Sequence, residues 1–167
     1  MSLTSAIKLQ VNATQTSALD LGSATFPAAI SSILSLATGT GAGQADLLFS
    51  DTRTLAASAT EDLDLAGSLT SAFGTTLTFA RIKAVIITAA SANTNNVQLT
   101  RPASNGVPLF LAAGDGLSVR PGGMFVWACT DATGVAVTAS TGDLLTLTNS
   151  AGSTSVTYSI MIIGASA

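Results

Sequence analysis

The sequence contains no histidine and one cysteine, and charged side chains make up only 9% of its 167 residues. Histidine is the side chain that most often transfers protons near neutral pH, so few groups are suited to acid–base catalysis. The single cysteine, Cys129, excludes a disulfide within the chain. It ends the apolar stretch 124–129, which predicts a buried strand, and we therefore expect a structural thiol that is not a nucleophile. The composition argues against an enzyme and indicates no catalytic, cofactor-binding or metal-binding residues.

Basic side chains are equally scarce. Six lysines and arginines are scattered between Lys8 and Arg120, and the formal net charge is −3. Nucleic-acid binders depend on clustered positive charge, so we expect no nucleic-acid partner. No run of 18 apolar residues predicts a membrane-spanning helix, and the first residues lack the basic and apolar regions of a signal peptide. We expect no membrane partner.

Serine and threonine supply 44 of the 167 residues, and 15 glycines and many β-branched side chains accompany them. This composition favours strands and tight turns. Alanine is also abundant, but it occurs in runs without a helical stripe. The mean hydropathy of +0.55, without a membrane span, indicates apolar surface that needs a partner. We predict an all-β protein that assembles with other chains.

The first 45 residues carry the clearest sign of such a partner. Ile7, Leu9 and Val11 alternate with polar residues, which predicts a strand with one apolar face. The tract 21–45 that follows contains no charge and ends in a glycine-rich loop at 39–43. In a core this tract would be ordinary, whereas on an arm it would need a second chain to cover it. We assign 1–45 to an N-terminal arm or extra strand, and expect interface contacts from Ile7, Leu9, Val11, Phe26, Ile30, Leu34 and Leu36.

Residues 46–167 predict about ten short strands separated by turns. This spacing is typical of a jelly-roll-like antiparallel β-sandwich. The longest strand signal runs from 76 to 88, and its apolar phase changes partway, which indicates a bulge or burial on both faces. The last strand, 156–163, is apolar on both faces near its end and is expected to be central in its sheet or covered by a neighbour.

Candidate binding groups have ordinary explanations. The glycines at 39–43 are not followed by the lysine of a phosphate-binding loop, so we expect a surface loop. Glu61, Asp62 and Asp64 lie on one predicted strand and face two directions, which does not form a calcium cage. Asp115 and Asp131 are expected to accept backbone hydrogen bonds in turns. We predict no cofactor and no metal.

Several segments resemble a family of small structural proteins of tailed bacteriophages and prophages. The resemblance spans residues 51–167. Its segments are DTRTLAASATEDLDL (51–65), RIKA (81–84), LAAG (111–114), RPGG (120–123) and TGDLL (141–145).

The resemblance implies a head decoration protein, also called a capsid cement protein. Such a protein would sit on the capsid surface of the virion as a homotrimer and clamp neighbouring major capsid proteins. It would be made in the cytoplasm of the host bacterium. The family motifs resemble strand and turn positions, so the resemblance identifies no individual capsid-contact residue.

Two other functions remain open at the level of sequence. The Ser/Thr-rich β composition is shared with phage fibres, so a fibre or tail-associated module that binds host glycans is the alternative. A hydrolase acting on cell-wall sugars would need two placed carboxylates, for which Asp62 and Asp64 are candidates. No motif supports that hydrolase.

Overall fold

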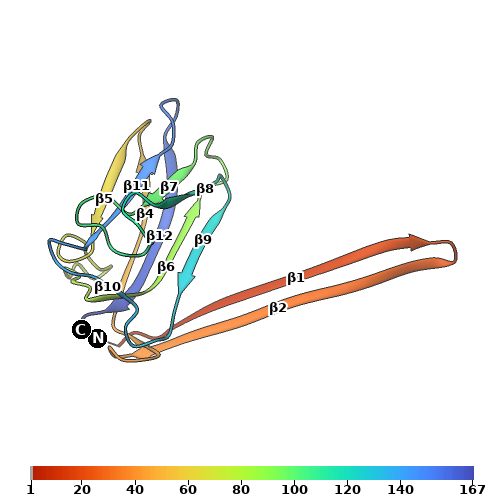
Figure 1. The fold of residues 1–167 in the computed structure, drawn as a ribbon, viewed down its shortest axis with the longest axis horizontal. Helices are drawn as coiled ribbons and strands as arrows, with labels where there is room; N and C mark the ends of the chain where they lie inside the picture. The colour runs from red at the N-terminus through yellow and green to blue at the C-terminus, as the bar shows by residue number, and fades with distance from the viewer. Residues whose placement is uncertain (1) are drawn as a thin grey trace.

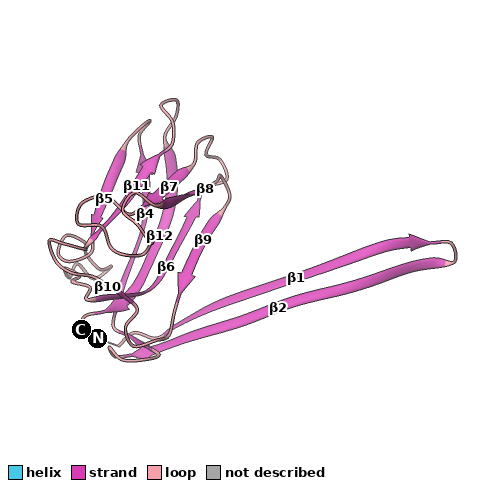
Figure 2. Cartoon of the chain, viewed as in Figure 1, coloured by secondary structure: helices cyan, strands magenta, loops and turns pink. Residues whose placement is uncertain are grey.

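The computed structural model describes residues 2–167 and consists of a β-sandwich from which a long hairpin projects (Figures 1 and 2). The hairpin, which we call the arm, is formed by β1 (Ser5–Leu19) and β2 (Gly22–Thr38). Within residues 2–167 the chain forms no helix with the length and apolar character needed to cross a membrane. The predicted all-β sandwich is confirmed.

The sandwich consists of a five-stranded and a four-stranded sheet. In the larger sheet the order is β10-β6-β12-β4, and β9 also pairs with β6; in the smaller it is β5-β11-β7-β8. All pairings in these two sheets are antiparallel. The larger sheet contains β4 (Leu47–Leu55), β6 (Arg81–Ala89), β9 (Met124–Ala128), β10 (Val135–Ala136) and β12 (Val156–Ala165). The smaller contains β5 (Thr60–Asp64), β7 (Val97–Thr100), β8 (Gly116–Val119) and β11 (Leu144–Asn149).

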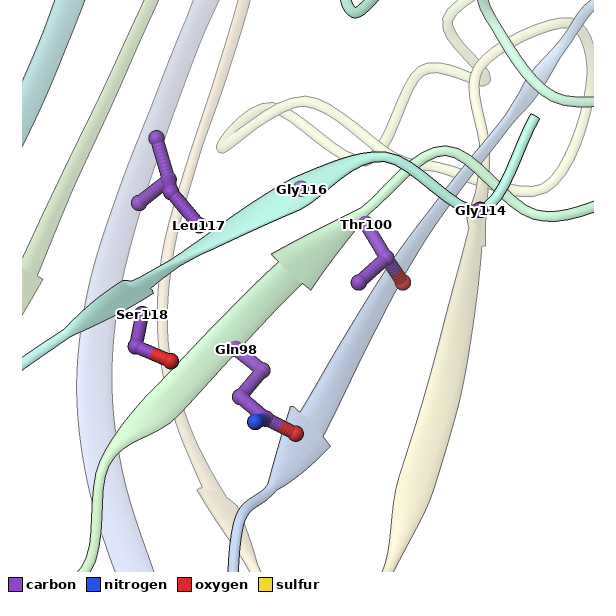
Figure 3. A pocket seen from close by; sticks show the side chains of 6 residues that line it. All are labelled: Gln98, Thr100, Gly114, Gly116, Leu117 and Ser118. Carbon is purple, nitrogen blue, oxygen red and sulfur yellow. The ribbon is translucent and has the colours of Figure 1, made fainter. Parts of the chain in front are cut away.

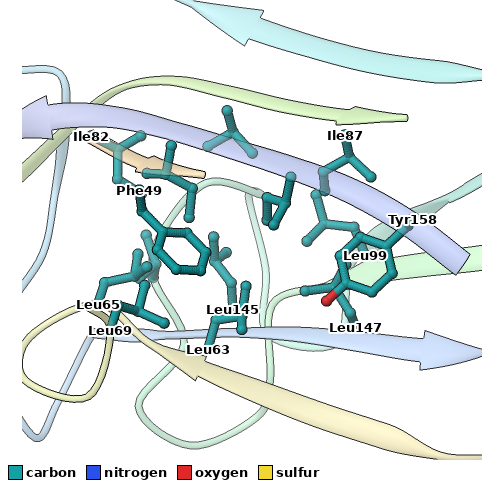
Figure 4. Close-up of a cluster of buried hydrophobic side chains, with 14 of the residues drawn as sticks. Phe49, Leu63, Leu65, Leu69, Ile82, Ile87, Leu99, Leu145, Leu147 and Tyr158 are labelled. Atoms are coloured by element: carbon teal, nitrogen blue, oxygen red, sulfur yellow. The ribbon is translucent and has the colours of Figure 1, made fainter. Parts of the chain in front are cut away.

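The main core lies between the two sheets (Figure 4). Leu63 and Leu65 point into it, whereas Asp62 is exposed and Asp64 half-buried. The alternation read from the sequence is therefore confirmed. Phe79, Ile87, Leu99, Leu147 and Tyr158 are among the largest fully or almost fully buried side chains.

The last strand is central, as one of its two predicted arrangements required. β12 pairs with β4 on one side and with β6 on the other. Its apolar residues therefore lie on both sheet faces with no edge exposed. Ile162 packs in the main core, and Ile163 packs in a second apolar cluster on the opposite face.

The strand predicted over 76–88 is shorter than expected. β6 begins at Arg81, and Leu77 and Phe79 precede it in a buried loop. Both predicted causes of the change of apolar phase are present: Ala84 and Val85 are buried on opposite faces of β6, and the strand also contains a bulge. Two successive residues of β12, Ile163 and Gly164, pair with Ala84 and Ile82, which leaves Lys83 as the extra residue of β6.

The strand around Cys129 is more exposed than expected. β9 pairs only with β6 and alternates in burial, with Phe125 and Trp127 packed against the core. Met124 is 69% exposed and Val126 45% exposed on the opposite face. The expectation of a buried strand was wrong because β9 is an edge strand with apolar side chains on both faces, and only the face of Phe125 and Trp127 is covered.

Candidate interaction surface

The arm is a two-stranded ribbon with one apolar and one polar face. Residues directly opposite each other in an antiparallel pair lie on the same face. Val11 lies opposite Ile30, and Gln15 opposite Phe26. One face carries Ile7, Leu9, Val11, Ala13, Leu19, Phe26, Ala28, Ile30 and Leu34 together with Gln15, Ser17 and Ser32, and we call it the apolar face. The opposite face, which we call the polar face, carries Lys8, Gln10, Asn12, Thr14, Thr16, Ser23, Thr25 and Ser31 together with Pro27 and Ile33.

The root of the arm packs onto the sandwich through this apolar face. Leu36 is 1% exposed and forms the second apolar cluster with Ala45, Ala84 and Ile163. Leu3, Ile7 and Leu34 pack against that cluster as half-buried side chains. Two hydrogen bonds between Leu3 and Thr38 Oγ1, of 2.9 and 2.6 Å, fix the start of the chain beside the end of β2. The arm is therefore anchored at its root.

Beyond the root the apolar face is exposed, and the sandwich, as far as residues 2–167 are described, does not cover it. Leu9, Val11, Phe26 and Ile30 are between 46% and 67% exposed. Figure 1 shows both strands extending away from the sandwich beyond the root. Scattered apolar residues on a surface are ordinary, but several large exposed apolar side chains on one face of a ribbon are typical of an interaction site.

The outer face of the larger sheet carries a second exposed apolar patch. Val126, Ile86 and Met161 lie side by side across β9, β6 and β12. Val126 and Met161 are exposed and Ile86 is half-buried. The adjoining row on the same face is Ala128, Ala84 and Ile163, which belong to the cluster packed against the arm root. The root therefore covers one row of this face, and in the next row Ile86 packs against the same cluster while Val126 and Met161 stay exposed.

The seven interface residues expected from the sequence divide into three groups. Leu9, Val11, Phe26 and Ile30 are exposed on the apolar face of the arm. Ile7 and Leu34 are half-buried at its root, and Leu36 is buried within the chain. Sequence reasoning did not identify the patch of Val126, Ile86 and Met161. The signal in the sequence was the apolar run 124–129, which is apolar on both strand faces and which we interpreted as a buried strand.

The carboxylates at 61–64 make separate structural contacts. Glu61 accepts hydrogen bonds from Arg53 and from the Tyr158 hydroxyl. Asp62 accepts one from the Thr146 hydroxyl, and Asp64 accepts one from the backbone N–H of Ala66 at 2.8 Å. No group of three histidine, cysteine, aspartate or glutamate side chains within residues 2–167 is arranged to hold a metal ion.

The contacts of Glu61 perturb its partners. Burial and the hydrogen bond to Glu61 raise the pKa of Tyr158 above its ordinary value. Partial burial lowers the pKa of Arg53, but the hydrogen bond and charge of Glu61 outweigh that effect and raise it overall. Both shifts keep the phenol and the guanidinium protonated, so this cluster fastens β4, β5 and β12 together.

Cys129 lies directly after β9, beside Asp131. Its side chain is half-buried, and burial together with the hydrogen bond to Asp131 raises its pKa to about 11. Asp131 accepts hydrogen bonds from the Thr133 hydroxyl at 2.7 Å and the Gly134 N–H at 2.6 Å, which lower its pKa. The buried Lys83 donates to the Asp131 carbonyl oxygen. Asp131 is thus the turn residue that the sequence indicated, and it organises the turn between β9 and β10.

A shallow polar hollow of about 300 Å³ lies over β7 and β8 (Figure 3). Gln98, Thr100 and Ser118 offer hydrogen-bonding groups, and Gly114, Gly116 and Leu117 complete its lining. None of these six side chains is aromatic, so the hollow has no ring on which a sugar could stack.

The other turn motifs have structural contacts. The Asp115 carboxylate accepts the N–H of Ala112 at 2.8 Å. The glycine-rich loop 39–43 folds over Gln44, whose side-chain oxygen accepts the N–H of Gly41 at 2.9 Å. The Gly43 N–H donates to the carbonyl of Thr130 at 2.7 Å. The Gly43–Thr130 hydrogen bond joins the loop that follows the arm to the turn after β9.

Comparison with known proteins gives no relative from which a function could be transferred. No protein-family model, curated protein or solved structure matches this chain.

Proposed function

We propose that this protein is a bacteriophage head decoration protein that binds the outside of the assembled capsid as a homotrimer and stabilises contacts between major capsid proteins. The observation that carries the proposal is the arm, a ribbon of 15-residue and 17-residue strands whose apolar face the chain leaves uncovered. The resemblance of 51–167 to phage structural proteins supplies the kind of assembly.

The physical reason is that the arm is a costly feature for a chain that works alone. A two-stranded hairpin is at best marginally stable in water, and this one exposes its apolar side chains along its length. A protein that works by forming additional contacts needs such a surface. A partner that binds only the assembled lattice raises the free energy needed to open it, by mass action.

The test is an arm truncation that leaves the root intact. Residues 10–31 are replaced by Asn-Gly, which joins Leu9 to Ser32, its partner in the register. The Leu9–Ser32 pair has the same alternation phase as Leu19–Gly22, which flanks the natural two-residue tip, so a two-residue turn fits there. Leu34 and Leu36 remain in place to cover the sheet.

Binding is measured by co-sedimentation with heads assembled from the major capsid protein of the same phage or prophage genome. We expect the full chain to sediment with heads and to raise their disassembly temperature, and the truncated chain to lose both effects. The control is Asn12→Asp, which places a charge on the polar face of the arm and should preserve binding. Failure of the full chain to bind heads, or equal binding by the truncated chain, would overturn the proposal.

A further inference from the structure

We propose that the exposed apolar face of the arm is covered by a second copy of this chain, and that it packs there on the outer face of the larger sheet, over Val126, Ile86 and Met161. This rests on the homotrimer of the proposed function and deepens it by naming the two surfaces that join its copies, in a contact that forms without any capsid.

Within one chain, the root of the arm already packs on the outer face of the larger sheet. At the root, Ile7, Leu34 and Leu36 pack against Ala84 and Ile163 on the outer face of the larger sheet. Further along the arm, Val11 and Ile30 lie on the same face of the ribbon as Ile7 and Leu34. The same ribbon face therefore has a demonstrated fit to the same sheet face.

The uncovered parts of the two surfaces adjoin each other. The exposed row of Val126, Ile86 and Met161 directly follows the row that the root covers. The arm turns away from the sandwich at its root (Figure 1). The apolar face of the arm and the row of Val126, Ile86 and Met161 therefore both continue from the contact made at the root.

The charges favour a second copy as the occupant. Between residues 5 and 38 the only charged side chains are Lys8 and Asp20, one on the polar face and one at the tip. The exposed row has no charged member. No like charges oppose the contact between copies, and an apolar surface without charge offers no electrostatic selectivity for a different partner.

The availability of the two surfaces also favours a second copy. Each chain carries one apolar arm face and one row of Val126, Ile86 and Met161, so the two surfaces occur in equal number. An exposed apolar ribbon needs cover as soon as it is made. A second copy is present at that time, whereas an assembled lattice is available only later.

The dimensions of the arm permit this contact. Fifteen residues of strand extend about 50 Å, whereas the ten residues of β12 extend about 33 Å. The arm is thus long enough to cross a neighbouring sandwich. Because arm and sheet are different surfaces, the contact is head-to-tail, and its repetition forms a ring where the rotation between copies closes, as the proposed homotrimer requires.

The first measurement is the solution mass of the full chain without capsids, by light scattering at micromolar concentration. We expect an oligomer that becomes monomeric when either surface receives a charge, through Val11→Asp on the arm or Val126→Asp on the sheet. The matched controls are Asn12→Asp on the opposite arm face and Ser118→Asp on β8, and both should preserve the oligomer. Thermal unfolding checks that each sandwich remains folded.

Mixing separates arm-to-sheet packing from arm-to-arm packing. The Val11→Asp chain has an intact sheet patch, and the Val126→Asp chain has an intact arm. A tagged copy of one should therefore capture the other, whereas neither should capture a copy of itself. Arm-to-arm packing would leave the mixture unassociated, because one of the two arms carries the charge.

The outcomes distinguish this inference from the proposed function. A full chain that is monomeric in solution, an oligomer that survives both Val11→Asp and Val126→Asp, or a mixture without capture would overturn the inference. A monomeric chain that still binds heads through its arm would leave the proposed function standing. An oligomer that does not bind heads would overturn the proposed function and leave this inference standing.

Discussion

The Tyr158 hydroxyl donates a hydrogen bond to one carboxylate oxygen of Glu61, and the other oxygen of Glu61 accepts a 2.7 Å hydrogen bond from Arg53. One carboxylate thereby joins β4, β5 and β12, which belong to both sheets. Arg53 also pairs with Asp51 at 3.0 Å and lies over the ring of Phe49. Glu61 therefore contributes to holding the two layers of the sandwich together.

Replacement of Glu61 should destabilise the fold more than replacement of Tyr158. Glu61→Ala leaves a phenol and a guanidinium without their acceptor, and we expect it to cost about 2–3 kcal/mol. Tyr158→Phe removes a single charge-assisted hydrogen bond and should cost about 1–2 kcal/mol. Urea denaturation measures both. Equal stability of Glu61→Ala and the unsubstituted chain would show that the cluster contributes nothing.

Asn149 should be among the most sensitive polar residues. It is 2% exposed, and its amide nitrogen donates to the carbonyls of Ala56 and Thr154 at 2.9 and 2.7 Å. Its side-chain oxygen accepts a 3.0 Å hydrogen bond from Asn95. Asn149→Ala leaves these buried groups without partners and should cost about 3 kcal/mol. The control is the half-buried Asn96→Ala, whose loss measured by urea denaturation should be under about 1 kcal/mol.

Cys129 should react slowly with thiol reagents. Its pKa is about 11, compared with an ordinary 9.0, so at pH 8 the thiolate fraction is about a hundredfold below that of a free thiol. We expect alkylation by iodoacetamide to be slower in that proportion and to accelerate with pH until about 11. Reaction in denaturant supplies the control. A native rate equal to the denatured rate would contradict the shift.

The same group makes stability depend on alkaline pH. The folded chain retains the thiol proton that the unfolded chain loses, so the free energy of unfolding should fall as pH rises from about 9 to about 11. Cys129→Ala should remove this part of the slope. Chemical denaturation of both chains at pH 8, 9.5 and 11 measures it, and parallel pH profiles would count against the prediction.

Asp131 should stabilise the fold at neutral pH and lose that effect in acid. Hydrogen bonds from Thr133 and Gly134 lower its pKa, so the folded state favours the carboxylate. Its contribution is present above the ordinary pKa of 3.8 and is lost as the pH falls below it. The thermal midpoint of Asp131→Ala should lie below that of the unsubstituted chain at pH 7. The difference should narrow at pH 3, and a gap of equal size at both pH values would contradict the assignment.

Gly164 occupies a site with no room for a side chain. A Cβ atom there would lie 2.2 Å from the carbonyl oxygen of Arg81 and 2.6 Å from the ring of Phe79. Gly164→Ala should therefore cost about 3 kcal/mol through forced displacement of β6. The matched control is Gly67→Ala, whose Cβ meets nothing within 4 Å, and its urea midpoint should hardly change.

Much of the sandwich could be predicted because its strands are amphipathic with a period of two. Leu63 and Leu65 alternate with Asp62 and Asp64, and the structure buries the former pair. The phase change before Val85 predicted a bulge because one extra residue reverses the facing of every residue after it. Local patterns such as these contain the information for which face is buried.

The segment that covers each strand face could not be predicted in the same way. Leu9 and Leu36 have similar sequence surroundings, yet one is exposed on the arm and the other is buried at the root. Val126 lies in an apolar run that resembles a core strand, yet β9 has only one neighbouring strand and its outer face is open. Exposure depends on which distant segment covers a residue, and the local pattern does not contain that information.

The sequence by itself determined the all-β class, the apolar face of 7–11 and the charge-free tract from 21 to 45, because alternation and charge are properties of neighbouring residues. Only the tertiary structure decided that β1 and β2 pair with each other and leave the sandwich. A strand with one apolar face can cover a core or form one side of a free ribbon, and the two cases have the same pattern. Packing of Leu36 against Ala84 and Ile163 fixes one end of the ribbon on the sandwich, and the rest of its apolar face stays exposed.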